Sequence, residues 1–381
     1  MYLLEHDAKQ LLATHGIPLP AGSLVEDAAN MPALPPGPWV VKAQVAVGGR
    51  GKAGGIRKTT TESETLAAAA GILRKRIRGL PVRGCRIEQQ VSGAVETYLS
   101  LMIDAAQAGV RVTLAPRGGV DIEALSAQPG LIRSALCDPE PSTVSACVRN
   151  LGNDLAEPLR SALAAAGSAL AVPFFAHECV LLEINPLFVK PDGTWFAGDA
   201  KMITDDNALG RQPALRELLQ ARAGSYPEVA LKLRHGCDYV VVDPDGEIGL
   251  LTTGAGLSMM LIDELRAAGL KPYNFLDVRT GGLRGEPTRL VHVLNWIAQG
   301  PRVKVILVNV FAGITDLGEF ARLLLAALAQ AQLKVPVVAR LIGNGIEAAQ
   351  QALGAARISV TTELDAAVAR VRDCLHGEPR P

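Results

Sequence analysis

The segment Cys179–Met202 reads CVLLEINPLFVKPDGTWFAGDAKM and predicts a β-hairpin. Apolar strand-type residues flank Pro191-Asp192-Gly193, whose backbone preferences suit a tight turn. Because residues two apart on a strand share one face, the side chains of the predicted pairs should emerge together. A turn centred on Asp192 pairs Asn185 with Asp199 and Glu183 with Lys201.

The pair of Asn185 and Asp199 offers an amide oxygen and a carboxylate to a hard cation. Mg²⁺ is usually held by one or two protein oxygens and completed by substrate phosphates and water. The hairpin therefore predicts a Mg²⁺ site beside a nucleotide. The alternative is a cross-strand polar pair on a solvated hairpin face.

Composition limits the class of protein. A chain of 381 residues predicts two or three domains. Lys plus Arg equals Asp plus Glu at 38 each, which gives no global electrostatic case for nucleic acid or a membrane as partner. Six cysteines without a C-x-x-C motif are expected to be reduced thiols. The first residues do not resemble a signal peptide, so we expect a cytoplasmic protein.

The Ala-rich segment 161–176 is short of a membrane span and contains Pro173. We expect it to form a buried helix followed by a loop.

A second candidate site follows the expected strand 39–45, which carries Lys42. Segment 48–55 reads GGRGKAGG, so its backbone N–H groups and cations can fold over phosphates, although it is not a Walker loop. The alternative is a flexible hairpin tip. Lys42 favours phosphate binding, because a buried lysine needs an anionic partner.

The rest of the first half predicts an α+β arrangement, since helices and strands alternate irregularly. We expect helices over 5–15 and 65–78, the latter with a basic C-terminal end, and strands over 84–91, 96–104 and 110–115.

From about residue 226, near-continuous apolar strands alternate with helices, which predicts a parallel sheet covered on both faces. The expected strands are 239–243, 249–252, 272–278, 303–310, 335–341 and 358–360. The expected helices are near 256–268, 287–299, 317–332, 345–353 and 363–376.

Four Gly-containing loops follow these strands, at the edge where such sheets bind ligands. They are Thr252–Gly256, Arg279–Gly285, Phe311–Thr315 and Gly343–Gly345. Small residues, backbone N–H groups and helix N-termini predict an anion site, with a carboxylate as ligand. The alternative is that these glycines only make tight turns.

Several motifs in the same order resemble the β subunit of succinyl-CoA synthetase and related ADP-forming acid–CoA ligases. They are L-x-E-H-x-A-K-x-L-L at the start, then V-V-K-A-Q-V-x-x-G-G-R-G-K-A-G-G, L-L-E-I-N-P-L, L-x-x-G-A-G-L and N-F-L-D-V. The resemblance implies an α/β protein with a two-lobed ATP-grasp domain (1–225) and a flavodoxin-like CoA-ligase domain (226–381). A small lobe of about residues 21–100 would be inserted in the larger ATP-grasp lobe.

The resemblance also implies roles for individual residues. Lys42, Gly49, Arg50 and Gly51 would hold nucleotide phosphates, and Glu88, the main chain near Val91, and Glu96 would lie at the adenosine. Asn185 and Asp199 match Mg²⁺ ligands, Glu183 matches the carboxylate that meets a partner's phosphohistidine, and Pro20 favours ATP over GTP. Thr253, Gly313, Ile314 and Thr315 match the acid site.

The acid-site loops depart from the family pattern. Thr253 replaces an asparagine, the glycine run becomes Arg279–Gly285, and Asp316 and Leu317 replace an arginine and a cysteine. We therefore expect a small dicarboxylate or an analogue: succinate, a malate-like acid, or a sulfonated acid such as sulfoacetate.

The six histidines lie outside these loops, so the chain is expected to lack its own phosphate acceptor. The resemblance implies an α subunit that binds CoA and carries the phosphohistidine, in an αβ or (αβ)₂ complex. Two alternatives stay open: a self-contained ATP-grasp carboxylate–amine ligase, and a non-catalytic nucleotide-binding subunit.

Overall fold

A computed structural model describes residues 1–119, 130–278, 285–331 and 335–377. The chain divides into two compact units, Met1–Leu218 (unit 1) and Leu219–Pro381 (unit 2). The expected domain boundary after residue 225 stays a prediction.

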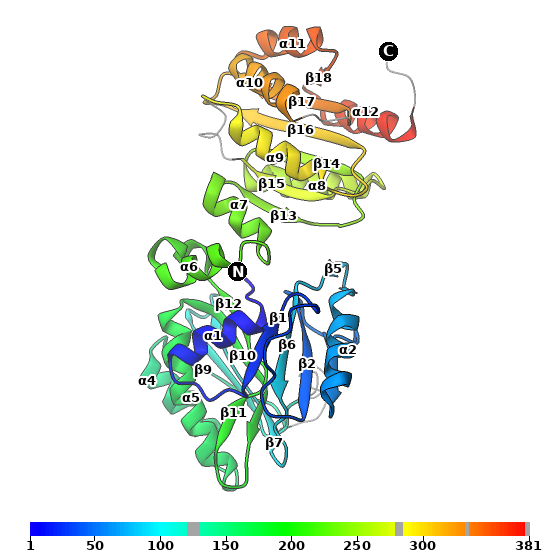
Figure 1. The fold of residues 1–381 in the computed structure, drawn as a ribbon. Coiled ribbons are helices and arrows are strands. Elements are labelled where there is room, and N and C mark those ends of the chain that lie inside the picture. The colour runs from blue at the N-terminus through cyan, green and yellow to red at the C-terminus, as the bar shows by residue number, and fades with distance from the viewer. Residues whose placement is uncertain (120–129, 279–284, 332–334, 378–381) are drawn as a thin grey trace. The chain divides into compact units, whose positions relative to one another are not determined.

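The first sheet of unit 1 has four antiparallel strands in the order β1-β6-β2-β3. They are β1 (Gly22–Val25), β6 (Gly84–Gln89), β2 (Trp39–Gln44) and β3 (Ile56–Thr59). Helix α2 (Glu62–Leu73) packs on this sheet and buries Ala69 and Ile72 against its apolar residues (Figure 1). The Thr61 side chain and Glu64 form a capping box that begins the helix.

The predicted helix over 65–78 is wrong at its C-terminal end. Helix α2 ends at Leu73, and β4 (Arg76–Ile77) pairs with β5 (Leu80–Pro81). Arg78 and Gly79 have φ values of +49° and +80°, so the chain turns back where a helix would need negative φ.

The second sheet of unit 1 has the order β11-β10-β7-β8-β9, and β12 pairs with β10. Its other strands are β7 (Val95–Asp104), β8 (Gly109–Ala115) and β9 (Arg133–Cys137). Strands β7 and β8 lie within one residue of the expected ranges 96–104 and 110–115. Helix α1 (Glu5–Thr14) ends close to Gly16, as predicted. Helices α4 (Pro141–Leu151), η1 (Asp206–Arg211) and α6 (Pro213–Ala221) complete this part of the chain.

The predicted hairpin is confirmed. β10 (Cys179–Val189) pairs with β11 (Trp195–Ala197) and β12 (Lys201–Thr204), and Glu183 lies opposite Lys201. The backbone N–H of Gly198 donates to the carbonyl of Pro186 at 2.9 Å, which keeps the same register past Asn185 and Asp199. Gly193 turns the chain with φ +84°.

Helix α5 (Leu159–Ala176) continues through Pro173, so the expected loop after this proline is wrong. It is the one described helix long and apolar enough to span a membrane, and 44% of it is buried inside the protein. Its buried face includes Leu163, Leu170 and Phe174, which is typical of a core helix.

Unit 2 contains a parallel sheet in the order β14-β16-β17-β18. The strands are β14 (Ile248–Thr252), β16 (Val305–Ala312), β17 (Val337–Gly343) and β18 (Ser359–Thr361). Along β16, alternate side chains pack on opposite faces. Figure 1 shows helices along this sheet. One face is covered by α9 (Thr288–Ala298), α10 (Leu317–Gln330) and α11 (Ile346–Ala355), and the other by α8 (Ala255–Ala267) and α12 (Leu364–His376).

The expected all-parallel sheet is wrong at one edge. β13 (Asp238–Val241), which follows α7 (Pro227–His235), pairs antiparallel with β15 (Asn274–Asp277). β15 still runs along β14, because the Asn274 side chain bonds both the N–H and the C=O of Leu250 at 2.9 Å. The backbone N–H groups of Tyr273 and Val278 also donate to the carbonyls of Ile248 and Thr252, at 2.8 and 3.0 Å, so the side-chain amide completes the pairing along β14.

Candidate functional site

Unit 1 contains a cavity of about 770 Å³. The glycine-rich loop after β2, the end of β6 and the β10–β12 hairpin contribute to its wall. All ten residues that the sequence assigns to nucleotide, metal or phosphohistidine line this cavity: Lys42, Gly49, Arg50, Gly51, Glu88, Val91, Glu96, Glu183, Asn185 and Asp199.

Two buried lysines and two buried glutamates form a charge cluster at this cavity, which Glu5, Lys42 and Glu88 line. Glu5 and Glu88 each contact both Lys9 and Lys42, at distances between 2.5 and 3.0 Å. Both ammonium groups also donate to the Gly198 carbonyl, Lys9 at 2.8 Å and Lys42 at 2.5 Å. These contacts fix helix α1, strand β2 and the β10–β12 hairpin to one another.

The charges of this cluster shift one another's pKa values. Burial disfavours the Glu5 carboxylate, but Lys42, Lys9 and Arg50 outweigh it and hold its pKa well below the usual range. Burial likewise opposes the charge of Lys42, yet Glu5, Glu88 and Asp199 raise its pKa above the ordinary value. Both groups are therefore charged at neutral pH.

Arg50 links the glycine-rich loop to the hairpin. One guanidinium nitrogen donates to both Asp199 oxygens, at 2.8 and 2.7 Å, and the other contacts Glu5 at 2.7 Å. The Asp199 side chain keeps 25% of its surface exposed toward solvent. A guanidinium thus lies on the carboxylate that the hairpin register assigns to a cation.

The other predicted metal ligand, Asn185, is positioned by a neighbouring loop. Its Oδ1 accepts a hydrogen bond from the Gly119 backbone at 2.8 Å. Gly119 has φ +73°, a backbone conformation that favours glycine, and a Cβ there would lie 1.6 Å from an oxygen of Glu96. Glu96 therefore lies beside this loop at the cavity wall.

Glu183 lies on the same hairpin face as Asp199. Burial and the Asp199 carboxylate raise its pKa, although Lys201 across the strand lowers it. Tyr98, on the neighbouring strand β7, is buried beside it, and burial raises the pKa of this phenol to about 12. Glu183 is thus a carboxylate whose proton affinity is increased, as is typical of functional sites.

Three charged members of this site were missed from the sequence: Glu5, Lys9 and Arg86. Glu5 and Lys9 are four residues apart on α1 and face inward. Arg86 contacts Glu88 and, at 2.7 Å, the His6 ring. The signal for Glu5 and Lys9 was present, because these charged residues share the inward face of α1 with Leu12, which is fully buried.

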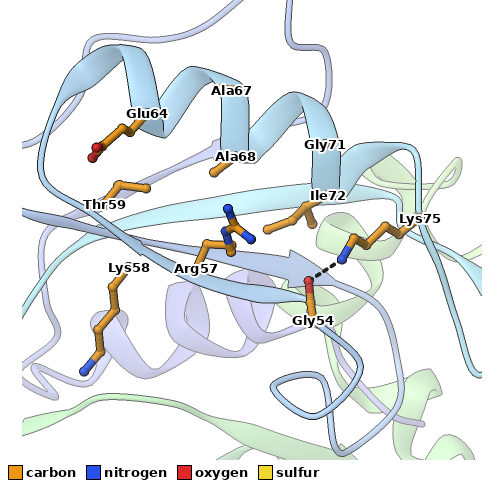
Figure 2. A pocket seen from close by; sticks show the side chains of 10 residues that line it. All are labelled: Gly54, Arg57, Lys58, Thr59, Glu64, Ala67, Ala68, Gly71, Ile72 and Lys75. Atoms are coloured by element: carbon orange, nitrogen blue, oxygen red, sulfur yellow. Dashed lines mark hydrogen bonds between the residues drawn. The ribbon is translucent and has the colours of Figure 1, made fainter.

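A second pocket, of about 450 Å³, lies between β3 and α2 (Figure 2). Arg57, Lys58 and Lys75 surround it, but all three side chains are exposed and Lys75 donates to the Gly54 carbonyl at 2.8 Å. It has none of the buried charge of the larger cavity.

In unit 2, the predicted acid-site residues lie at the carboxyl edge of the parallel sheet. Thr253 follows β14, and its Oγ1 is buried without a hydrogen-bond partner among the described residues. Helix α8 begins directly after it, with no side-chain cap at Gly254. A buried hydroxyl and uncapped helix amides together suit an anion.

The loop after β16 carries the remaining predicted acid-site residues. Thr315 is buried, whereas Gly313 is exposed and 82% of the Ile314 surface is exposed. Asp316 accepts from the Glu319 N–H at 2.8 Å and so caps α10, and Leu317 belongs to the core. The predicted arginines of segment 279–284 lie outside the described residues.

The donors of the cavity fit Mg²⁺ better than a softer metal. The described residues contain no group of three or more His, Cys, Asp or Glu side chains able to hold an ion. One amide oxygen and one carboxylate leave most coordination positions to phosphate and water, as Mg²⁺ prefers.

Comparison with known families agrees with this architecture. Residues 2–189 match the ATP-grasp domain model, and residues 251–373 match the CoA-ligase model. These two domains in this order define an ATP-grasp protein of the acid–CoA ligase class.

Individual relatives narrow this class. The chain is 37% identical over 94% of both chains to the β subunit of an ADP-forming succinate–CoA ligase from Chloroflexus aurantiacus. It is equally identical, over 93% of both chains, to the GDP-forming β subunit from Thermus thermophilus. The chain belongs to the family of succinate–CoA ligase β subunits.

A solved structure of ATP citrate lyase from Methanothrix soehngenii, with citrate and coenzyme A, shares the fold. Its TM-score is 0.68 at 17% identity, over 98% of this chain and 99% of that one. At this identity the likeness concerns the fold alone.

Proposed function

We propose that this chain is the nucleotide-binding β subunit of an ADP-forming acid–CoA ligase that acts with an α subunit. The observation that supports this most is the convergence of all ten predicted residues on one cavity in unit 1. Residues 42 and 199 are far apart in sequence, yet Lys42 is bonded to the residue that precedes Asp199. Such convergence is not expected of a solvated hairpin or a flexible loop.

Asn185 and Asp199 would hold Mg²⁺, which when bound neutralises phosphate charge. Lys42, Arg50 and the amides of Gly49 and Gly51 would bind the phosphates, and Glu96 and the main chain at Val91 would face the adenosine. Glu88 was assigned to the adenosine as well. Its oxygens are bonded to three cations, which favours a role in holding Lys42.

The relatives include both ADP-forming and GDP-forming enzymes at the same identity, so they do not decide the base. Pro20 lines the cavity and supports the proposal of ATP.

Unit 1 would position ATP so that its γ-phosphoryl group passes to a histidine of the α subunit, with ADP as leaving group. Glu183 would accept a hydrogen bond from that histidine and orient it. The phosphoryl group then passes to the acid's carboxylate, giving an acyl phosphate, and the CoA thiol displaces phosphate to form the thioester. The first step releases ADP, the second returns the histidine to its free form, and the third releases phosphate.

Unit 2 would hold the acid through Thr253, Thr315 and the loop amides at Gly313 and Ile314. The proposed acid is a small dicarboxylate such as succinate, or a hydroxylated or sulfonated analogue. The Thr253 hydroxyl supports this, because it offers one donor and acceptor where the family has an amide.

Labelling with γ-³²P-ATP tests the proposal. We expect the chain alone to take up no label, and the chain with its α subunit to transfer label to a histidine of that subunit. Acyl-CoA formation by the isolated chain would overturn the two-subunit proposal.

A further inference from the structure

We infer that Lys9 is a positioning residue of the nucleotide site. Lys9 gives this site its surplus positive charge and lies behind Lys42. The Lys9 side chain has no exposed surface. It therefore acts through other residues and not by touching a ligand. This inference rests on the proposed nucleotide site.

Lys9 and Lys42 share the same three acceptors: Glu5, Glu88 and the Gly198 carbonyl. Lys42 lines the cavity and keeps 9% of its side chain exposed, whereas Lys9 does not line the cavity. The acceptors are thus held by one cation that can reach a ligand and by one that cannot.

The balance of charge explains why both lysines are present. Among the described residues, the ion pairs that begin from these two lysines join seven side chains: the carboxylates Glu5, Glu88 and Asp199 and the cations Lys9, Lys42, Arg50 and Arg86. Three negative and four positive charges leave one positive charge over. Without Lys9 the cluster would be neutral.

A triphosphate needs cations that are not fully consumed by carboxylates. If Lys42 and Arg50 turn toward phosphate, Glu5 and Glu88 lose part of their pairing, and an unpaired buried carboxylate is costly. Lys9 stays on both carboxylates and keeps them compensated. The cavity can then exchange its carboxylate contacts for phosphate contacts.

The test measures Mg-ATP binding to the full chain by calorimetry. Circular dichroism first checks that each variant is folded. Lys9→Met makes the cluster neutral, so we expect binding to weaken by at least ~10-fold, the scale of one charge at short range. Lys271→Met is the matched control, because Lys271 is an exposed lysine of unit 2. We expect this variant to bind Mg-ATP with wild-type affinity.

The double variant Lys9→Met/Glu88→Gln restores the surplus, with two carboxylates against three cations. We expect the double variant to bind Mg-ATP at least about threefold tighter than Lys9→Met alone. A residue that only stabilises the fold would not be rescued by removal of a second charge. If Lys9→Met fails to fold, the double variant is compared with Glu88→Gln: we expect the double variant to bind at least about threefold more weakly, and equal affinity would overturn the role of Lys9.

Wild-type affinity in Lys9→Met, or a double variant that binds no tighter than Lys9→Met, would overturn the role of Lys9. Failure of the proposed function looks different, because the wild-type chain itself would then take up no Mg-ATP.

Discussion

The two units of this chain bury different kinds of polar residue. Among the described residues, the buried polar side chains of unit 2 are all uncharged: Thr252, Thr253, Ser258, Asn274, Asn309 and Thr315. Those of unit 1 include Glu5, Asp7, Lys9, Lys42, Arg86 and Glu88. Unit 1 therefore carries a buried charge cluster, and the described part of unit 2 carries buried hydroxyls and amides.

This difference follows the ligands that we propose. A triphosphate with its metal has a large local charge, which needs fixed charges in a site of reduced dielectric. A small acid has one or two charges, which helix amides and a hydroxyl can bind. The predictions below test whether charge controls unit 1 while neutral donors control unit 2.

The largest effect is expected at Lys42. In Lys42→Met the cavity loses the ammonium that contacts Glu5, Glu88 and Gly198, while Lys9 keeps the two carboxylates paired. We expect phosphoryl transfer to the α subunit to fall by at least ~100-fold. Labelling that stays within a few-fold of wild type would contradict a charge-based site.

The two units should also differ in their stability at low pH. The pKa values of Glu5 and Glu88 are lowered in the folded state by Lys42 and Lys9, against the effect of burial. Groups with lowered pKa stabilise the fold above their unfolded pKa, and this stability is lost as pH falls below about 4.5 toward the folded values.

Unit 1 is therefore expected to open before unit 2 as pH is lowered from 5 to about 3. Hydrogen exchange followed by mass spectrometry on peptides of each unit measures this order. Earlier opening of unit 2 would show that the buried charges of unit 1 do not govern its acid stability.

Arg50 should give effects of opposite sign on metal and nucleotide. Its guanidinium occupies both Asp199 oxygens, so it competes with a cation there, yet it would contact phosphate once released. In Arg50→Ala we expect Mn²⁺ alone to bind about threefold tighter and ATP about tenfold weaker. Electron paramagnetic resonance measures the Mn²⁺ affinity, and calorimetry measures the ATP affinity. Weaker binding of both Mn²⁺ and ATP would refute the competition between Arg50 and the cation.

The smallest effect is expected in unit 2. Thr253→Val keeps the side-chain shape but removes the buried hydroxyl, so we expect the KM for the acid to rise about fivefold. Thr253→Ser should stay near wild type, and Mg-ATP binding should not change in either. Equal KM values in wild type and the valine variant would exclude Thr253 from the acid site.

Much of unit 1 could be predicted because its signals are local. The Asp192 turn fixes the hairpin register, and strand periodicity then places Asn185 and Asp199 together. Lys42 was predictable because a lysine within a buried strand needs an anionic partner. The sequence did not identify that partner: Glu5 lies on α1, and the contact depends on tertiary packing.

The errors have the same origin. An apolar pattern reveals neither the antiparallel pairing of β13 with β15 nor the Asn274 amide that bonds β15 to β14. The end of α2 at Leu73 depends on a turn at Arg78 and Gly79 that holds two short strands together. Patterns of hydrophobicity predict elements, and particular polar side chains decide how their ends are joined.

The most direct test of the charged site is ATP uptake by the purified chain, with and without magnesium. Calorimetry measures ATP affinity under both conditions for the wild-type chain and for Asp199→Asn. This variant keeps the side-chain shape and removes the charge. We predict that magnesium increases wild-type affinity by at least ~10-fold and that Asp199→Asn loses this increase. Equal affinity with and without magnesium in the wild-type chain would contradict the account.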